Sequence, residues 1–305
     1  MTQGDLAATA PRVATTTSIR VESPGRRALR RFLRHRLALI GLATIGIIVV
    51  LALVGSEAKA LQQNLRLGFT NQPPGEIPGY PLGTDALGRD VLSRTLVGGR
   101  ISIMVAIVSV AIATGVGTLI GVISGYAGGR VDGVLMRFVD VVLSFPTILL
   151  LLVVAFLVGP GLLTLMIMIG LVTWAPGARI IRGQVLALRQ ATFIEAARVI
   201  GVSGRQMIVG HILPNIVAPL VVFATFGVAS VIVFEASLSY LGLGVQQPTP
   251  SWGNLVQQTR VITVLERMAW QWAPAAGFIV LMVLAVNFVG DGLRDAFDQR
   301  AISDR

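Results

Sequence analysis

Long apolar runs separated by short polar segments dominate this chain, and six of these runs are long enough to cross a lipid bilayer. About 20 helical residues cross the hydrocarbon layer, because each residue of an α-helix adds about 1.5 Å. The pattern therefore predicts an all-α polytopic membrane protein with six transmembrane helices. The expected spans cover residues 37–54, 101–123, 134–158, 162–181, 217–243 and 272–289.

Two of the expected spans carry features of helix packing or of interruption. Gly117, Gly121 and Gly125 repeat every four residues in the second span, a spacing that lets transmembrane helices approach closely. We interpret these glycines as a packing surface and not as a nucleotide loop, because no strand accompanies them. Trp174 and Pro176 interrupt the fourth span.

The segments between the spans give the predicted organisation of the chain. A cleavable signal peptide is an alternative for the first span, because Ala58-Lys59-Ala60 resembles a cleavage site, but the apolar run exceeds the usual length of such a signal. We therefore expect a retained helix. The predicted division is a cytoplasmic N-terminal tail 1–36, a first transmembrane helix 37–54, a Pro/Gly-rich extracytoplasmic segment 55–100, a core 101–292 with five transmembrane helices and a polar cytoplasmic loop 190–215, and a cytoplasmic C-terminal tail 293–305.

The composition agrees with a membrane protein and excludes most soluble classes. The chain is 54% hydrophobic and 13% charged, with a mean hydropathy of +0.77. Its net charge of +10 comes from 25 basic residues, of which all but one are arginine. These arginines cluster beside apolar runs without the aromatic pattern of a nucleic-acid binder, so we expect contact with lipid and no nucleic-acid partner.

The distribution of basic residues predicts the orientation in the membrane. If the chain crosses the membrane six times, 18 arginines lie on the side of the membrane that holds both termini, and seven basic residues lie on the opposite side. Because basic residues concentrate on the cytoplasmic side, the sequence predicts a protein of the cell (inner) membrane with both termini and the polar loop in the cytoplasm.

Several kinds of chemistry are absent from the sequence. There is no cysteine, and the two histidines, His35 and His211, lie outside any metal-ligand spacing. Lys59 is the only lysine and has no P-loop around it, so we expect no ATP site on this chain. Ser203 and His211 do not form a credible catalytic pair, because no strand precedes the serine. We therefore expect a protein that is not an enzyme, with no catalytic residue, bound cofactor or metal.

The polar loop of the core contains two short helix signals. Thr192 with Glu195 and Ser203 with Gln206 each match a capping box, in which a hydroxyl and a carboxyl or amide group satisfy the first backbone N–H groups of a helix. Gly201 separates the two signals and is suited to a left-handed helix end.

The second helix is expected to stop at Pro214, which has no backbone N–H. One face of the first helix is apolar and slim, which is typical of a helix that lies in a groove of another protein. The expected face consists of Phe193, Ala196, Ala197 and Ile200.

The same loop resembles the "EAA" loop of permease subunits of binding-protein-dependent ABC importers. In that family the loop is cytoplasmic and its coupling helix seats in a cleft of the ATPase subunit. A hairpin that only connects two spans is the alternative. The residues that carry the resemblance, and that it assigns to ATPase docking, are Glu195, Ala196, Ala197, Gly201, Ile212, Leu213 and Pro214.

A second motif resembles the GTDxxGRD signature of dipeptide and oligopeptide permeases. Thr84 or Asp85 is expected to cap the next helix, and Arg89 to pair with Asp85 or Asp90. Beyond capping, the segment is a candidate for positioning the loop where a solute-binding protein docks. The motif comprises Gly83, Thr84, Asp85, Gly88, Arg89 and Asp90.

Glu235 is a carboxylate within the fifth expected span, where a charge costs roughly 2.5–3.5 kcal/mol at mid-bilayer. It should therefore face the bundle or a polar path, with a structural hydrogen-bond role as the alternative to contact with the substrate. Its surroundings resemble the family pattern E-x-S-L-S-F-L-G-L-G, with Tyr240 in place of the phenylalanine. For Asp140, pairing with Arg137 is the expected explanation.

The resemblance covers about residues 27–300 and indicates the dipeptide/oligopeptide (DppC/OppC-like) branch of ABC importer permeases. It implies the type I importer fold and a translocation path for peptides. It also implies a homologous (DppB-like) permease, ATPase subunits (one fused or two) that bind ATP and Mg²⁺, and an extracytoplasmic solute-binding protein. An ion-coupled secondary transporter or channel is the competing hypothesis, and a structural scaffold is a third.

Overall fold

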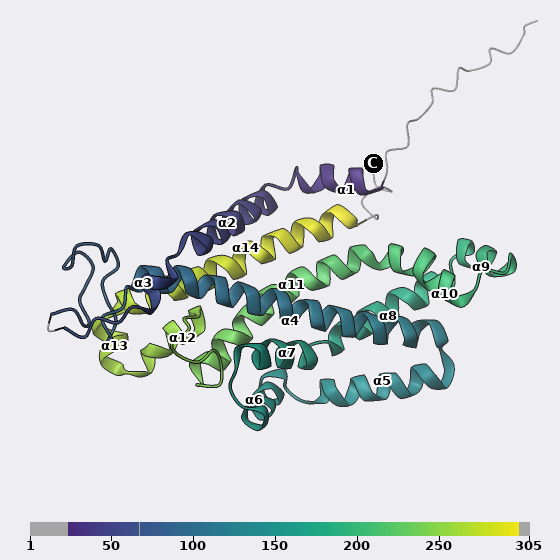
Figure 1. Cartoon of the computed structure of the whole chain (residues 1–305). Helices are drawn as coiled ribbons and strands as arrows, with labels where there is room; N and C mark the ends of the chain where they lie inside the picture. Colours follow the sequence, from purple (N-terminus) through teal and green to yellow (C-terminus); the bar gives the residue numbers. More distant parts are fainter. Residues whose placement is uncertain (1–23, 67, 299–305) are drawn as a thin grey trace, which may run out of the picture.

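The computed structural model describes residues 24–66 and 68–298, and the regular secondary structure of these residues is helical. The single exception is an isolated bridge between Thr84 and Asp90. The helices run side by side as an elongated bundle (Figure 1). This is the predicted all-α polytopic fold.

Among the described residues, four helical runs are long and apolar enough to cross a membrane alone, and two bent pairs bring the total to six if each pair counts as one span. The single runs are α2 (Arg36–Val54), α4 (Val91–Ala127), the continuous run Gly204–Tyr240 that ends with α11 (Leu213–Tyr240), and α14 (Ala273–Phe297). The bent pairs are α5 (Gly129–Ser144) with α6 (Thr147–Val158) and α7 (Leu162–Val172) with α8 (Ala175–Arg189).

The third expected span is not one straight helix, because α5 and α6 meet at 88°. Phe145 between them is extended, with φ −93° and ψ 137°. It precedes Pro146, whose ring disfavours a helical conformation at the residue before it. The weaker bend of 41° between α7 and α8 lies at Thr173-Trp174, close to the interruption expected around Trp174 and Pro176.

Shorter helices gather at the two ends of the bundle. One end, which we call the α13 end, contains α3, α12 and α13 together with long loops, and α9 and α10 lie at the opposite α9 end (Figure 1). α1 lies beside the end of α14, on the α9 side of the bundle. Their bounds are α1 Pro24–Phe32, α3 Glu57–Leu61, α9 Thr192–Val199, α10 Gly204–Gln206, η1 Met207–Ile212, α12 Trp252–Val256, η2 Gln257–Arg260, α13 Ile262–Arg267 and η3 Ala269–Gln271.

α4 is the central helix and contacts α2, α7, α8 and α11. Its most extensive contact is with α8, and the three glycines predicted to pack lie at this contact. A Cβ atom added at Gly117 would lie 2.8 Å from the Trp174 carbonyl oxygen, and one at Gly121 would lie 2.6 Å from that of Ala178. At Gly125 it would lie 2.8 Å from Val185 Cβ. The packing role expected for these glycines is confirmed.

The two expected tails are only partly described. Residues 1–23 and 299–305 lie outside the described part of the chain. α1, within the expected N-terminal tail, packs on the end of α14 through Ala28, Phe32 and Ala296. α14 itself continues to Phe297, through residues assigned to the C-terminal tail.

Candidate functional site

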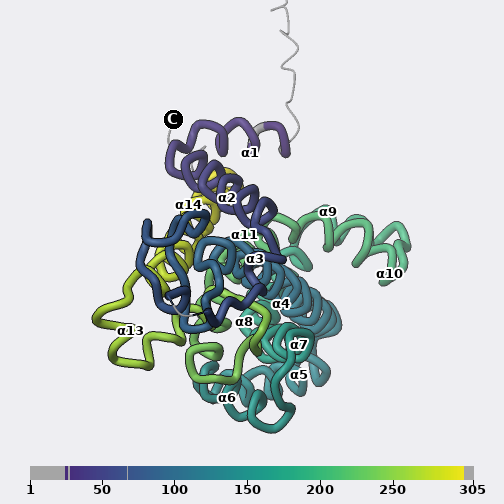
Figure 2. Tube along the Cα trace, turned by 60° about the vertical axis from the view of Figure 1, so that its left-hand side comes forward, coloured from purple at the N-terminus to yellow at the C-terminus, as the bar shows by residue number. Residues whose placement is uncertain are grey.

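The segment between α8 and α11 forms two short helices that project from the α9 end of the bundle (Figure 2). α9 ends in a complete Schellman motif, in which Val202 N donates to Ala197 O at 3.1 Å and Gly201 N donates to Arg198 O at 3.1 Å. Gly201 has φ +84°, the left-handed conformation expected from the sequence. α10 then begins at the predicted capping box of Ser203 and Gln206.

The other expected capping box is wrong. Thr192 is the first helical residue of α9, and Ala191 is the N-cap without a side-chain hydrogen bond. The Ala191 carbonyl oxygen accepts the N–H groups of Ile194 and Glu195 at 2.9 and 3.2 Å. The helix thus begins one residue too early for the Thr192 hydroxyl to act as its cap.

The stop expected at Pro214 is also wrong, because the helix runs on from α10 through η1 into α11. η1 is a π-helix, and Leu213 N donates to Ile208 O, five residues back. This wider turn directly precedes Pro214, so the missing N–H of the proline falls where the hydrogen-bond register already changes. The projecting segment is therefore continuous with a membrane-spanning helix.

α9 divides its apolar residues between an inner and an outer side. Ile194 (0% exposed) and Ala197 (6%) are buried against the end of the bundle. Phe193 (46%), Val199 (87%) and Ile200 (80%) are exposed. The expected common face is thus split, since Ala197 points inward. The inner residues belong to an apolar cluster with Val122, Ile181, Val185, Met207, Ile212 and Ile216.

The remaining residues of the EAA-like motif lie on either side of this division. Glu195, Ala196, Gly201 and Pro214 are exposed, and Leu213 is half-buried. We call the exposed residues Phe193, Ala196, Val199 and Ile200 the α9 tip.

The GTDxxGRD-like motif folds into a buried polar cluster at the α13 end. Asp85 is 2% exposed and accepts from the backbone N–H of Leu87 and Arg89 at 2.9 and 3.0 Å and from Arg89 Nε at 2.7 Å. The expected pair of Arg89 and Asp85 is therefore confirmed. Arg94 Nε lies 3.5 Å from Asp85 Oδ2, and Gln247 Oε1 accepts from both arginines at 3.1 and 3.3 Å.

The cap of α4 is Asp90, and the expectation that Thr84 or Asp85 would be the cap is wrong. Asp90 accepts the N–H groups of Leu92 and Ser93 at 3.3 and 3.2 Å. Thr84 instead connects its own loop to the preceding loop around residues 69–72. Its hydroxyl donates to Phe69 O at 2.6 Å and accepts from Gln72 N at 2.9 Å.

Positions 83 and 88 require glycine for two reasons: the backbone is in the left-handed conformation, and a neighbouring loop passes too close to leave room for a side chain. Their φ angles are +73° and +68°, and a Cβ atom would lie 2.2 Å from Gln72 O and 2.0 Å from Asn64 O, respectively. Together the motif residues hold the long loops against the start of α4, and most of their side chains are inaccessible from outside.

Glu235 on α11 is fully buried and holds three segments together. It accepts from the hydroxyls of Ser102 on α4, Ser239 on α11 and Ser251 before α12, at 3.0, 2.8 and 2.8 Å. Gly253 is also close, since a Cβ atom there would lie 3.0 Å from Glu235 Oε1. The structural hydrogen-bond role considered for Glu235 is the one its surroundings support.

Other charged side chains form pairs between neighbouring helices. Asp140 pairs with Arg179 at 2.6 Å and not with Arg137, because α8 and not the same helix presents the nearer guanidinium group. Arg182 on α8 makes two hydrogen bonds of 2.6 Å to the carboxylate of Asp132.

The two histidines have interactions of their own. His35 caps α2 by accepting from Ala38 N at 3.1 Å, and its other ring nitrogen lies 3.5 Å from Asp295 Oδ2. Among the described residues, no group of three or more acidic, histidine or cysteine side chains has the geometry to hold a metal ion.

Sequence reasoning did not identify Arg94, Gln247, Ser102 and Ser251 as members of these clusters. Arg94 could have been identified from the sequence, because it is a charged residue just after the motif and at the start of an apolar run. Nothing in the sequence near Ser102 or Gln247 indicates their roles, because their partners lie more than a hundred residues away along the chain.

With this geometry established, similarity to known proteins identifies the family. Residues 117–303 match the binding-protein-dependent transport system inner membrane component family. The chain belongs to this family. Residues 23–74 match the N-terminal transmembrane domain of oligopeptide transport permease C. The chain is therefore a membrane permease component of a binding-protein-dependent transport system and not an enzyme.

Several relatives resemble nearly the whole chain. A protein of Brucella suis biovar 1 named as a peptide permease is 42% identical over 279 residues, covering 91% of this chain and 92% of its own. The oligopeptide transport system permease protein OppC of Escherichia coli K12 is 40% identical over 277 residues, covering 90% of each chain. Its Haemophilus influenzae counterpart is 39% identical over 275 residues, covering 90% of this chain and 88% of its own.

Proposed function

We propose that this chain is one of two homologous permease subunits of an ATP-driven importer and that its cargo is a peptide. Family membership supports the role of a permease, and the names of the relatives support the peptide. A channel or ion-coupled transporter has less support, because such a protein needs carboxylates that are free to bind ions along the path. Glu235 in the bundle and Asp85 at its end are instead bonded to other groups of the protein.

The observation that carries the proposal is the α9 tip. Val199 and Ile200 are 87% and 80% exposed at the end of a helix whose other side is buried. An amphipathic helix with its outer apolar face exposed is suited to a hydrophobic groove of a partner. We assign that groove to an ATPase subunit.

ATP and Mg²⁺ then bind the ATPase partner, which is either one fused protein or two subunits. The continuous helix from Gly204 to Tyr240 gives the transmission route, because α10, η1 and α11 form one run. A displacement of the tip would move α11, and with it one wall of the bundle.

The described part of the chain has one such projecting segment, so a dimeric ATPase would engage a second, homologous permease with its other half. Closure of the ATPases would bring the two segments together and open the path outward, and hydrolysis would return the path to its inward-open state.

In this assembly the α9 end and both termini face the cytoplasm, as the arginines of α1 and α8 favour. The α13 end faces the solute-binding protein. We call Asp85, Arg89, Arg94 and Gln247 the Asp85 cluster, which holds the long loops of this end in place. α13 lies at the same end as these loops (Figure 1), and Val261 and Ile262 at its start are exposed apolar residues.

The test is affinity capture of the tagged chain, coexpressed with its partner subunits, from mild detergent. Ile200→Glu places a charge on the α9 tip at a side chain that is 80% exposed, so the fold should be preserved. Ile262→Glu is the matched control at the other end of the bundle, where the side chain is 68% exposed.

We expect the wild type and Ile262→Glu to retain the ATPase subunits on capture and Ile200→Glu to lose them. In proteoliposomes, Ile200→Glu should also lose the peptide-stimulated ATP hydrolysis that the wild type shows; Ile262→Glu is a control for capture alone, because Ile262 lies on the face assigned to the solute-binding protein. Retention of the ATPases and full activity in Ile200→Glu would overturn the assignment of α9 as the docking helix.

A further inference from the structure

α5 exposes a strip of polar and small residues along one side of the helix. These residues recur at intervals of three or four, so they share one face. We call them the α5 strip, which consists of Arg130, Gly133, Arg137, Asp140 and Ser144, all exposed. A neighbouring exposed side of the same helix is apolar and consists of Val131, Val134, Phe138, Val141 and Phe145. The helix therefore presents one side to the bundle, one polar side and one apolar side.

The middle of the α5 strip lies at the depth of the apolar run of α4. The Phe138 ring stacks on Trp174, with ring centroids 5.7 Å apart. The Trp174 carbonyl oxygen would lie 2.8 Å from a Cβ atom at Gly117. Gly117 lies about six residues, or about 9 Å, inside the end of the apolar run that leads toward α5. The charges of Arg137 and Asp140, next to Phe138 along α5, therefore lie within the hydrocarbon layer.

A side with these charges does not face lipid. Charged side chains at membrane depth face the interior of a bundle or a water-filled cavity, because hydrocarbon does not solvate them. A long arginine side chain can extend to the interface, but the short side chain of Asp140 cannot. Asp140 pairs with Arg179 of α8, and each of the two side chains is 55% exposed. The α5 strip and the adjoining face of α8 are therefore in contact with water or with a polar partner.

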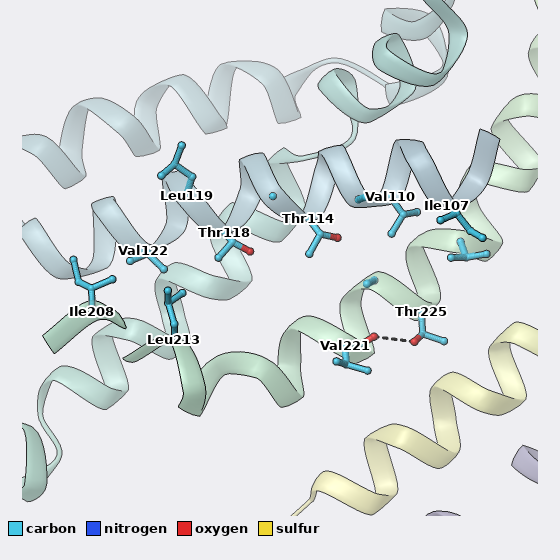
Figure 3. A pocket seen from close by; sticks show the side chains of 14 residues that line it. Ile107, Val110, Thr114, Thr118, Leu119, Val122, Ile208, Leu213, Val221 and Thr225 are labelled. Carbon is cyan, nitrogen blue, oxygen red and sulfur yellow. Dashed lines mark hydrogen bonds between the residues drawn. The ribbon is translucent and has the colours of Figure 1, made fainter. Parts of the chain in front are cut away.

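The groove between α4 and α11 provides a contrast at the side of the bundle. It is lined by apolar residues and threonines, without a charged side chain (Figure 3). Nothing in that lining selects a polar occupant over lipid. The α5 strip does, because its charges require water or a counter-charge.

Arg137 is the charge of the α5 strip that is available to a ligand deep in the membrane. Its side chain is exposed, and no group in the described part of the chain bonds it. Asp140 is three residues away, but its carboxylate is engaged by Arg179 at 2.6 Å. A guanidinium group presents parallel N–H donors that match the two oxygens of a carboxylate. The ligand that fits Arg137 is therefore a carboxylate.

A second permease of the same kind is a poor source of that carboxylate. Equivalent faces of homologous subunits oppose each other across a two-fold axis. The α5 strip has two arginines and one aspartate, so two equivalent strips would repel each other in direct contact. Water then separates the strips and leaves room for cargo. Every peptide with a free C-terminus carries a carboxylate.

We propose that the α5 strip lines the translocation path and that Arg137 binds the C-terminal carboxylate of the passing peptide. This inference rests on the proposed function, which supplies the peptide cargo and the second permease. The site is open to water, and exposed ion pairs are weak. The contact therefore guides the peptide without trapping it.

The first measurement tests whether the α5 strip is in contact with water. The chain has no cysteine, so Arg137→Cys gives it a single thiol. A charged methanethiosulfonate reagent labels that thiol only from water. The sample is the complete importer in lipid nanodiscs, where both membrane faces are open to the reagent. Val141→Cys is the matched control, because Val141 is 58% exposed on the apolar side of the same helix.

We expect Arg137→Cys to be labelled at least about tenfold faster than Val141→Cys, because the charged reagent is excluded from hydrocarbon. Equal rates for the two variants would overturn the proposal. Absence of labelling in Arg137→Cys would overturn it as well, because lipid or a helix of the partner permease would then cover the strip.

The second measurement tests the carboxylate, through transport by the complete importer in proteoliposomes. The probes are a radiolabelled alanine pentapeptide and the same peptide with a C-terminal amide. Arg137→Gln removes the charge and Arg137→Lys keeps it. Arg26→Gln on α1 is the control, because Arg26 is exposed and lies outside the α5 strip. The solute-binding protein is the same in every assay, so its own preference cancels when variants are compared.

We expect the preference for the free carboxylate over the amide, measured as a ratio of kcat/KM, to fall about fivefold in Arg137→Gln. Arg137→Lys should keep most of this preference and Arg26→Gln all of it. An unchanged preference in Arg137→Gln would overturn the proposal while leaving the importer assignment intact. If the wild-type complex retains its ATPases but moves neither peptide, the peptide function itself fails, and this inference fails with it.

Discussion

The α9 tip and the Asp85 cluster lie at opposite ends of the bundle and differ in which side chains they expose and which they bury. At the α9 tip, apolar side chains such as Val199 and Ile200 are exposed at 87% and 80%. In the Asp85 cluster, charged side chains such as Arg89 and Arg94 are exposed at only 6% and 0%. A motif whose region exposes apolar side chains and one whose region buries charged side chains therefore look equally specific in sequence, and burial distinguishes them.

The largest expected effect is on the Asp85 cluster. Asp85→Ala removes the carboxylate that Arg89 and Arg94 face, and a buried charge that loses its partner costs about 3–5 kcal/mol of unfolding free energy. Thermal unfolding in detergent measures the loss. Asp140→Ala is the control, because both side chains of its pair are 55% exposed and such pairs contribute at most about 1 kcal/mol. Equal effects of the two variants would contradict the contrast between the two regions.

Glu235→Gln is expected to lower the free energy of unfolding by less than Asp85→Ala does. The hydroxyls of Ser102, Ser239 and Ser251 accept backbone N–H groups at 3.1, 3.3 and 3.2 Å, so their protons are directed to the carboxylate. A glutamine NH₂ group would face one of these donors, at a cost of about 1–3 kcal/mol.

Exposed Glu266→Gln is the control for this substitution. Unfolding temperatures of the two variants in the same detergent measure the difference. If the Glu235→Gln variant is as stable as its control, the hydrogen bonds between Glu235 and the three serines contribute little to the stability of the α13 end.

The caps of the projecting segment should give a still smaller and local effect. Ser203→Ala removes the capping box of α10 and should cost about 0.5–2 kcal/mol locally. Thr192→Ala should change little, because Thr192 makes no side-chain cap. Hydrogen exchange measures the fraying, at the amides of residues 204–207 for Ser203→Ala and of residues 193–195 for Thr192→Ala. Faster exchange at 193–195 in Thr192→Ala, with unchanged exchange at 204–207 in Ser203→Ala, would reverse the assignment of the caps.

The smallest expected change in stability is at the α9 tip itself. Val199→Ser alters a side chain that is 87% exposed, so the unfolding free energy should change by no more than about 0.5 kcal/mol. Binding of the ATPase subunits, measured by capture from detergent, should nevertheless weaken. A clear loss of stability without loss of capture would mean that the tip serves the fold and not a partner.

Much of the fold follows from patterns confined to a few turns of chain. The apolar runs, the glycine repeat at 117, 121 and 125, the left-handed Gly201 and the Ser203 cap were all predictable. The errors were local as well. Thr192 matched the capping pattern one residue away from the helix start, and Pro214 followed a π-turn that tolerates it.

The candidate sites were predictable in location but not in composition. Asp85 and Arg89 lie four residues apart, so their pairing was expected, whereas Gln247 joins them from more than 150 residues away. Asp140 had Arg137 three residues away, yet the fold brings Arg179 closer. Short-range rules consider only neighbours along the chain, and helix packing decides which side chain is nearest in space.

The sequence by itself determined that the chain is a helical membrane protein with a projecting polar segment, because hydropathy, helix period and capping depend on adjacent residues. The tertiary structure alone decided which signature residues are exposed at the α9 tip and which are buried beside Asp85 and Glu235. Burial and hydrogen bonding across the bundle depend on contacts between residues distant in sequence, and only packing of the helices creates those contacts.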